Sequence, residues 1–324
     1  MKATARANTN IALIKYWGKR DEKLFLPMNS SLSITLDRFY STTTVEFMEE
    51  LKEDQLILNN NHGSNEDRIK VSNFLTKIRD IAGTNLYASI ITENNVPTAA
   101  GFASSASGFA ALAAAATKAL GLELKDDELS IIARQGSGSA CRSIYGGYVE
   151  WDMGTRADGR DCVAKQILDE KKWKLSILSA IVDTGSKKVS SREGMKRTVE
   201  TSPYYKGWLE TASYDLNEAK NAIKERDFQK LGEVMESNSL KMHATMLGAR
   251  PPILYWESGT VETMNCITKL RLAGIPAYFT IDAGANVKVI CLPDYEEEIK
   301  KALMELKGVL QVVVCYPGHG VSYL

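Results

Sequence analysis

The stretch from Pro97 to Leu120, PTAAGFASSASGFAALAAAATKAL, limits the possible folds of this chain more than any other. Its run of small residues leads directly into an alanine-rich segment, which Gly121 ends. Alanine favours helix, and small residues let backbone amides approach a ligand closely. Because a helix N-terminus also attracts anions, the pattern predicts a phosphate-binding loop. An ordinary helix start, with capping serines and packed alanines, is the open alternative.

Around this segment, strand patterns and helical patterns follow one another without a regular βαβ rhythm. Strand-like runs occur at residues 11–15, 32–36, 43–47, 87–92, 174–182, 277–282, 287–292 and 309–315. Longer helical patterns occur near residues 64–81, 204–224 and 228–246. This mixture predicts an α+β fold. Because the chain has no flexible linker, we expect two packed domains, 1–183 and 184–324.

Composition narrows the class of ligand and the compartment. The 40 basic and 40 acidic residues give a formal net charge of zero, whereas nucleic-acid binders usually carry a basic surplus. The five cysteines form no C-x-x-C pair, which argues against disulfides and for a reducing compartment. The most apolar stretch is too short to span a bilayer, and we recognise no signal peptide. We therefore expect a cytoplasmic protein with neither a nucleic-acid nor a membrane partner.

Two other segments combine cations with groups that suit an anion. In NTNIALIKYWGK, residues 8–19, Lys15 and Lys19 flank two aromatic hydrogen-bond donors. In GSGSACRSIYGGYVEW, residues 136–151, glycine–serine pairs precede Arg142, whose fork can grip carboxylate or phosphate. Taken alone, the first segment is better explained as an amphipathic strand. A flexible turn with a surface arginine is the alternative for the second.

In order along the chain, five blocks resemble the diphosphomevalonate decarboxylase family of the galactokinase, homoserine kinase, mevalonate kinase and phosphomevalonate kinase (GHMP) superfamily. They are the blocks at 8–19 and 136–151, P-x-x-x-G-F-A-S-S-A-S from Pro97, KKVSSREGMKRTVETSP at 187–203 and FTIDAGANVKV at 279–289. The last is similar to the family's D-A-G-P-N-V, with Ala285 in place of proline, and stands where the kinases carry a third, glycine-rich motif. The resemblance implies a GHMP kinase-type fold, in which an N-terminal ribosomal-protein-S5-like domain packs on a ferredoxin-like C-terminal domain.

The resemblance also implies a reaction. Diphosphomevalonate and ATP, with Mg2+, would give isopentenyl diphosphate, carbon dioxide, ADP and phosphate through a 3-phosphorylated intermediate, in the mevalonate pathway of isoprenoid biosynthesis. The closest alternative is a GHMP-type kinase or decarboxylase that acts on mevalonate or its monophosphate. A second alternative is an inactive relative used as a binding protein. By analogy with relatives we expect a homodimer.

Residue by residue, the resemblance implies a site. Asp282 would act as base or orienting acceptor for the tertiary hydroxyl, Lys187 would offset charge on the γ-phosphoryl group, and Arg142 would hold the carboxylate. The substrate contacts would be Tyr16, Trp17, Gly18, Lys19, Ser137, Gly138, Ser139, Ala140, Cys141, Ser191, Arg192 and Thr198. The ATP contacts would be Pro97, Ala100, Gly101, Ala103, Ser104, Ser105 and Ser107, with Ser105 also on the magnesium ion. His243 lies inside a helical pattern, which favours packing over catalysis.

Overall fold

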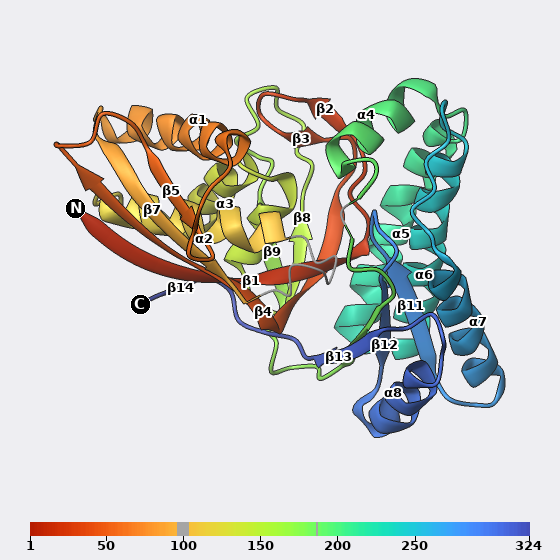
Figure 1. Ribbon diagram of the computed structural model, residues 1–324. Helices are drawn as coiled ribbons and strands as arrows, with labels where there is room; N and C mark the ends of the chain where they lie inside the picture. Colours follow the sequence, from red (N-terminus) through yellow and green to blue (C-terminus); the bar gives the residue numbers. More distant parts are fainter. Residues whose placement is uncertain (96–103, 186) are drawn as a thin grey trace.

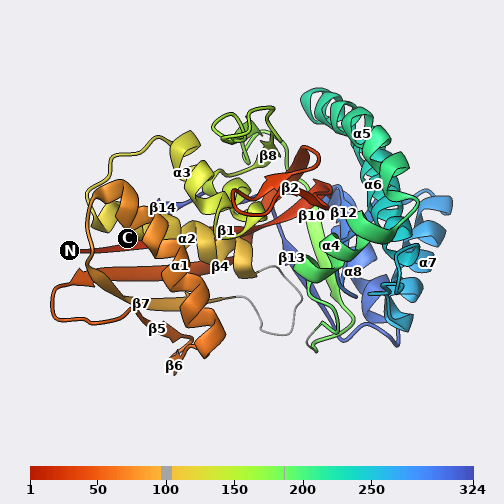
Figure 2. The same cartoon turned by 90° about the horizontal axis from the view of Figure 1, so that it is seen from above.

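A computed structural model of the chain describes residues 1–95, 104–185 and 187–324. Two separate sheets, each with its own helices, make up most of it, so the α+β class is confirmed. Figure 1 shows the first sheet on the left and the second on the right, with the chain passing between them more than once. Figure 2 shows α1, α2 and α3 grouped with the first sheet and α5, α6 and α7 with the second.

The first sheet is built on two long antiparallel strands, β1 (Lys2–Ile14) and β4 (Ser31–Met48). Its eight strands run in the order β14-β1-β4-β7-β5-β6, while β8 pairs with β4 and β9 pairs with β8. The remaining bounds are β5 (Gln55–Leu58), β6 (Asn61–His62), β7 (Tyr87–Asn94), β8 (Tyr148–Trp151), β9 (Ala164–Leu168) and β14 (Ser322–Tyr323). Register shifts between Asn8 and Asn10 and between Ala12 and Ile14 interrupt the β1–β4 ladder. The shifts bend the strand just before Lys15.

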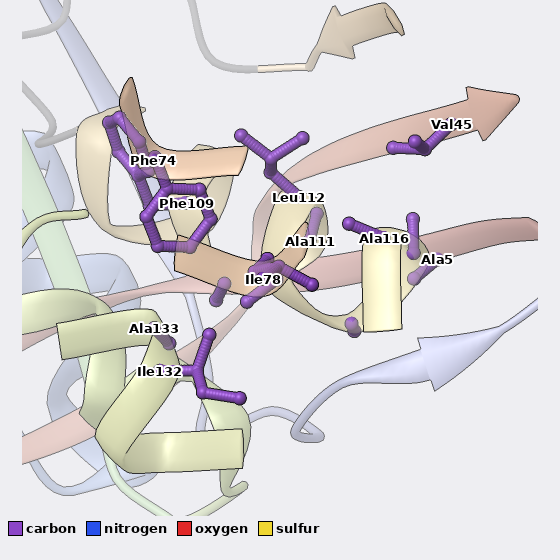
Figure 3. Close-up of a cluster of buried hydrophobic side chains, with 14 of the residues drawn as sticks. Ala5, Val45, Phe74, Ile78, Phe109, Ala111, Leu112, Ala116, Ile132 and Ala133 are labelled. Carbon is purple, nitrogen blue, oxygen red and sulfur yellow. The ribbon is translucent and has the colours of Figure 1, made fainter. Parts of the chain in front are cut away.

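The alanine-rich segment forms α2 (Ser104–Ala119), which lies against β1 and β4. Its alanines are buried because the short side chains let the helix approach the sheet closely (Figure 3). Phe109 of this helix meets Phe74 of α1 (Asn65–Ala82) edge to face, with ring centroids 5.2 Å apart. Helix α3 (Asp126–Arg134) and the 3-10 helix η1 (Gly138–Ile144) complete this layer. The predicted helix after the small-residue loop is thus confirmed.

The second sheet has four antiparallel strands in the order β11-β12-β10-β13. They are β10 (Ser176–Ile181), β11 (Ala277–Ile281), β12 (Val287–Cys291) and β13 (Gln311–Cys315). One face packs with β1, β4, α5 (Tyr205–Glu225) and α6 (Phe228–Leu247) in a shared core. The other face packs on α7 (Ser258–Leu272) and α8 (Glu296–Met304), beside the short 3-10 helix η2 (Pro293–Tyr295).

The sheets divide the chain differently from the predicted boundary after residue 183. Strand β10 was predicted within the first domain, but it pairs with both β12 and β13 in the second sheet. All six of its residues are buried, as a central strand requires. The end of the chain crosses back, where β14 pairs with β1 through Ala5 and Tyr323. Both termini therefore lie at the first sheet (Figure 1).

Two smaller elements project toward the junction of the sheets. A short hairpin joins β2 (Lys19–Asp21) to β3 (Leu26–Pro27), and α4 (Ser191–Thr201) follows the segment that leaves β10. All five cysteines are free, as the sequence predicts. Within the described ranges, every helix is too short or too polar to cross a membrane.

Candidate active site

A cavity of about 470 Å3 opens where the two sheets meet. Its walls come from the end of β1, the β2–β3 hairpin, η1, the start of α4 and the loop after β11. Twelve predicted site residues line it: Tyr16, Trp17, Lys19, Ser105, Ser137, Gly138, Ser139, Arg142, Lys187, Ser191, Arg192 and Asp282. Segments that are far apart in sequence thus bring the predicted catalytic residues and most of the predicted substrate contacts to one place.

An ion pair between a buried lysine and a partly exposed aspartate lies in this cavity. The Lys15 ammonium lies 2.7 Å from an Asp282 carboxylate oxygen and also donates to the carbonyl of Ala12 at 3.0 Å. The Lys15 side chain is 2% exposed, whereas that of Asp282 is 37% exposed. The carboxylate therefore faces the cavity while its cation lies behind it. Lys15 is the direct partner of Asp282, whereas Lys187 acts on it only through its charge.

Three lysines hold Asp282 ionised. Burial would raise the pKa of this carboxyl, but the charges of Lys15, Lys288 and Lys187 outweigh burial and hold the pKa well below its usual range. Burial in turn lowers the pKa of Lys288 to about 8, against the opposing pull of Asp282. Burial also lowers the pKa of Lys187, although this side chain lies at the exposed mouth of the cavity. A carboxylate facing a cluster of ammonium groups suits chemistry in which negative charge moves nearby.

Arg142 is a buried cation that makes no ion pair among the residues the structure describes. Its guanidinium donates to Ser31 at 2.7 Å and to the Asn10 amide oxygen at 3.3 Å. Both acceptors are neutral, so they fix the direction of the fork without cancelling its charge. Burial lowers the pKa of the guanidinium, yet arginine stays protonated in proteins. The site therefore offers an oriented positive charge for an anionic group of a ligand.

Two buried donors from residues that line the cavity add to this anion site. The Tyr16 hydroxyl and the Trp17 indole nitrogen are buried without hydrogen-bond partners among the described residues. Burial raises the pKa of Tyr16 well above its ordinary value, so its hydroxyl stays protonated. A side chain at Gly138 would approach this hydroxyl within 3.1 Å, so glycine leaves the space in front of it open. Buried donors without partners are costly, and a bound anion would satisfy them.

Two serines meet where the cavity reaches the start of α2. The Ser137 hydroxyl lies 3.4 Å from that of Ser105, which stands at the start of α2. Glu66 lines the same cavity, and hard oxygen ligands of this kind suit Mg2+. No group of three or more metal-ligating side chains occurs in the part of the chain that the structure describes. A magnesium ion here would take most of its ligands from phosphates and water, as this ion usually does.

Five predicted residues do not line the cavity. Gly18 has a φ of 102°, and a Cβ there would lie 2.0 Å from the Tyr205 hydroxyl, so glycine is required by packing. Ala140 and Cys141 are buried behind the η1 backbone, where burial raises the pKa of the cysteine thiol to about 12. Thr198 is buried and donates to a carbonyl within α4. Ser107 is buried and bonds to Ser41. Pro97, Ala100, Gly101, Ala103 and the Ser104 side chain lie outside the described residues.

Sequence reasoning missed several residues of the site. Lys288 and Asn10 approach it from strands whose neighbours could not be predicted from local patterns. Phe25 and Lys70 also line the cavity, although neither lies in a segment whose pattern indicates a functional role. His243 is buried in α6, where burial lowers its pKa to about 4, and its ring packs on Trp256. This agrees with its predicted packing role.

Solved structures define the class to which this fold belongs. The mevalonate diphosphate decarboxylase of Staphylococcus aureus superposes with a TM-score of 0.95 at 44% identity, covering all of this chain and 98% of the other. A structure described as MDDEF in complex with MVAPP, AMPPCP and magnesium gives 0.94 at 47% identity and covers 100% and 99% of the two chains. The protein is thus an enzyme of the GHMP kinase type.

Sequence comparisons identify the family. The model for the diphosphomevalonate decarboxylase-like N-terminal domain matches residues 7–164, and that for the mevalonate 5-diphosphate decarboxylase C-terminal domain matches residues 177–314. The Homo sapiens diphosphomevalonate decarboxylase is 38% identical over 322 residues, 93% of this chain and 79% of that protein. The Saccharomyces cerevisiae enzyme is 39% identical over 94% of this chain and 82% of its own. The chain belongs to the diphosphomevalonate decarboxylase family.

Proposed function

We propose that this protein catalyses the ATP-dependent decarboxylation of (R)-5-diphosphomevalonate to isopentenyl diphosphate, with carbon dioxide, ADP and phosphate as the other products. The observation that carries the proposal is the pairing of two features in one cavity. Asp282 is a carboxylate held ionised by lysines, and Arg142 is an oriented cation without a carboxylate partner among the described residues. Phosphorylation of a tertiary hydroxyl needs the first feature, and a carboxylate substrate needs the second.

In the first step, Asp282 orients the tertiary hydroxyl and takes its proton as the oxygen attacks the γ-phosphorus of ATP. The low pKa keeps the carboxylate free to accept a hydrogen bond at neutral pH. Lys15 stays behind Asp282 and fixes its position. Lys187, at the mouth of the cavity, offsets negative charge on the moving phosphoryl group. Ser191, whose hydroxyl lies 3.4 Å from the Lys187 ammonium, stands beside the same centre.

In the second step, phosphate leaves with the electrons of the C–O bond while the bond to the carboxylate breaks. The electron pair of that bond becomes the new double bond, and carbon dioxide departs. Arg142 holds the carboxylate until then, and its two neutral anchors fix the direction of the breaking bond. A lysine at this place would hold the same charge without the fork.

The diphosphate end of the substrate contacts the wall built by the β1 end, η1 and α4. Its contacts are Tyr16, Trp17, Lys19, Ser137, Gly138, Ser139 and Arg192. Four predicted contacts support this wall by packing behind it. The Tyr205 side chain fills the space beside Gly18, and the side chains of Ala140, Cys141 and Thr198 are buried. The wall combines two cations with several uncharged donors, which is the composition expected for a small phosphate ester.

ATP lies across the start of α2. Ser105 lines both the main cavity and an adjoining cavity of about 200 Å3, which is walled by Leu56, Ile90 and Leu112 and edged by Thr92 and Asn94. An apolar slot with polar edges suits the base and sugar, and the shared serine suits the phosphates between them. Ser105 would supply the protein's oxygen to a magnesium ion, which neutralises phosphate charge when bound.

The test compares three substrates. The purified protein is incubated with ATP and Mg2+ together with mevalonate, its 5-phosphate or its 5-diphosphate, and carbon dioxide and ADP are measured. We expect both products only from the diphosphate, in equal amounts. ADP without carbon dioxide would identify a kinase. Carbon dioxide from the monophosphate would identify the alternative decarboxylase.

We also infer a homodimer in a reducing, cytoplasmic setting. The dimer rests on analogy with relatives, and the setting on five free cysteines, four of them buried thiols. Sedimentation equilibrium over a range of concentrations should give twice the 35.8 kDa chain mass. A constant monomer mass would refute the dimer.

A further inference from the structure

Phe25 stands at the tip of the β2–β3 hairpin in an unusual backbone conformation. Its φ is 54°, in the left-handed region that bulky residues rarely adopt. The half-buried side chain lines the main cavity. A backbone conformation that costs free energy persists where surrounding structure enforces it, and such positions cluster at functional sites. The question is what this ring does at the edge of the cavity.

Leu24, the residue before Phe25, is held by hydrogen bonds to both its backbone amide and its backbone carbonyl. The Leu24 amide donates to the Asp21 carboxylate at 2.7 Å, and the Leu24 carbonyl accepts from Arg134 at 3.2 Å. Arg134 is itself fully buried, and Leu26 on the other side of Phe25 is 2% exposed. These contacts hold the hairpin tip, so Phe25 presents its ring from a fixed support.

Three cations from three different elements surround this ring. The Lys19 ammonium lies 4.4 Å from the ring centroid, the Lys77 ammonium 5.7 Å, and the Arg192 guanidinium carbon 5.8 Å. They belong to β2, α1 and α4, respectively. All three lie within the range of a cation–π attraction, in which the negative face of the ring attracts the charge. Lys19 and Arg192 also line the cavity, on the wall proposed to hold the diphosphate.

Like charges repel, and this wall contains several. Lys19 has one carboxylate partner, Glu22 at 2.5 Å, whereas Arg192 makes no ion pair among the described residues. The charge of Arg192 helps to lower the pKa of nearby Lys70, after the larger effect of burial. A shared aromatic face offsets such repulsion without adding a negative charge that would itself repel a diphosphate. A carboxylate in place of the ring would also attract the cations, but it would cancel their positive charge.

We propose that Phe25 is a positioning residue that gathers Lys19 and Arg192 on one wall of the cavity and so sets the affinity for the diphosphate end of the substrate. The inference rests on the proposed function of that wall. It assigns the phenyl ring no part in the chemical steps. Loss of the aromatic face should therefore weaken substrate binding and leave turnover at saturation nearly unchanged.

The test uses three variants. Phe25→Leu should raise the KM for diphosphomevalonate by about 3- to 30-fold, as expected for the loss of such contacts. Phe25→Tyr keeps the aromatic face and should keep the KM. Tyr40→Leu is the matched control, because Arg6 stacks 4.2 Å from its half-buried ring on β4, away from the cavity. If Phe25→Leu does not fold, Phe25→Asn replaces it, since asparagine tolerates the left-handed conformation.

Titration calorimetry with inorganic pyrophosphate separates this inference from the proposed function. Pyrophosphate should bind the wild type and Phe25→Tyr with similar affinity and Phe25→Leu more weakly, whatever the catalytic activity. An unchanged KM and pyrophosphate affinity in Phe25→Leu would overturn the inference. So would an equal loss in Phe25→Tyr, or a fall in kcat at unchanged KM. A wild type that turns over none of the three mevalonate substrates would refute the proposed function instead.

Discussion

At the residue scale, the site depends on how each charge is anchored. Arg142 shows this most simply, since its fork is fixed by Ser31 and Asn10. Arg142→Lys should lower kcat/KM by roughly a hundredfold or more, because the charge remains but the two-pronged grip is lost. Stability should fall by only about 1–2 kcal/mol, from the lost hydrogen bonds. Steady-state kinetics and urea unfolding of the same preparation measure both. Normal turnover would show that Arg142 does not hold the carboxylate.

Lys187 differs from Arg142 because it stands at the exposed mouth and, among the described residues, hydrogen-bonds only to Ser191. Lys187→Ala should leave diphosphomevalonate binding largely intact while slowing phosphoryl transfer, since its charge is needed as the phosphoryl group moves. Equilibrium binding and single-turnover rates distinguish these two effects. A weaker affinity at an unchanged rate would make Lys187 a simple diphosphate contact.

Motif resemblance predicted the residues that face the cavity better than it predicted their partners. Asp282, Arg142 and Lys187 were predicted and line one cavity. Lys15 was recognised as a cation near the anion site, but its bond to Asp282 joins segments 267 positions apart. Such a pair depends on how two sheets dock, which no local pattern records. Lys288 was missed for the same reason, because the residues of β12 show only the pattern of a buried strand.

At the scale of elements, the buried side chain of Asn286 anchors the start of the loop that carries Lys187. Asn286 accepts from the Val182 amide at 2.7 Å and the Asp183 amide at 3.0 Å, and it donates to the Asp183 carbonyl. These bonds fix the chain as it leaves β10. The Asn286 carbonyl also accepts from the Lys288 ammonium at 3.3 Å. One residue thus supports both the loop and a cation of the Asp282 cluster.

Asn286→Ala should therefore affect stability and catalysis together. Leaving the partly buried amides of Val182 and Asp183 without this partner should cost about 1–3 kcal/mol of the free energy of unfolding. Turnover should also fall, because Lys187 loses its fixed approach to the cavity. Thr117→Ala is a control, since this buried hydroxyl bonds only within α2 and should leave turnover unchanged. Full activity in Asn286→Ala would separate the loop anchor from catalysis.

Local patterns predicted helices better than strands. The segments that became α2, α5 and α6 carry helical periodicity over many residues, so they were found. The predicted strands at 32–36 and 43–47 are parts of one 18-residue strand, β4. The polar and exposed residues between them, among them Asp37 and Arg38, hid the continuity. Membership of β10 in the second sheet depends on partners more than a hundred residues away, which its own sequence does not identify.

At the scale of the whole molecule, a buried histidine of α6, beside the end of β11, should make stability depend on pH. His243 is 3% exposed, and burial lowers its pKa to about 4 from an ordinary 6.5. The unfolded chain therefore binds a proton more readily than the folded one. This contribution to stability is complete above pH 6.5 and is lost as the pH falls toward 4, by on the order of 3 kcal/mol.

Urea unfolding at pH 7 and pH 4.5 tests this dependence. Wild type and His243→Gln share every other titrating group, so their difference isolates the histidine. The glutamine variant should be less stable at pH 7, because packing on Trp256 is lost. Its stability should fall less on acidification than that of the wild type. Equal losses in the two proteins would show that His243 is protonated in the fold.

In the proposed mechanism, Asp282, held ionised by Lys15 at 2.7 Å, acts in the phosphorylation step. Asp282→Asn preserves size and shape and removes only the negative acceptor. The variant should fold and bind both ligands, while the first step slows by about a hundredfold to ten-thousandfold. Because phosphorylation precedes decarboxylation, neither the 3-phospho intermediate nor carbon dioxide should accumulate.

A single-turnover rapid-quench experiment with ATP labelled at the γ-phosphate measures this directly. Wild type and Asp282→Asn are mixed with diphosphomevalonate, Mg2+ and labelled ATP, and the labelled intermediate, free phosphate and carbon dioxide are followed over time. We expect the labelled intermediate from the wild type, followed by free phosphate and carbon dioxide, and none of them at a comparable rate from the variant. Formation of the 3-phospho intermediate at the wild-type rate, with no carbon dioxide after it, would place Asp282 in the second step, contrary to the proposed mechanism.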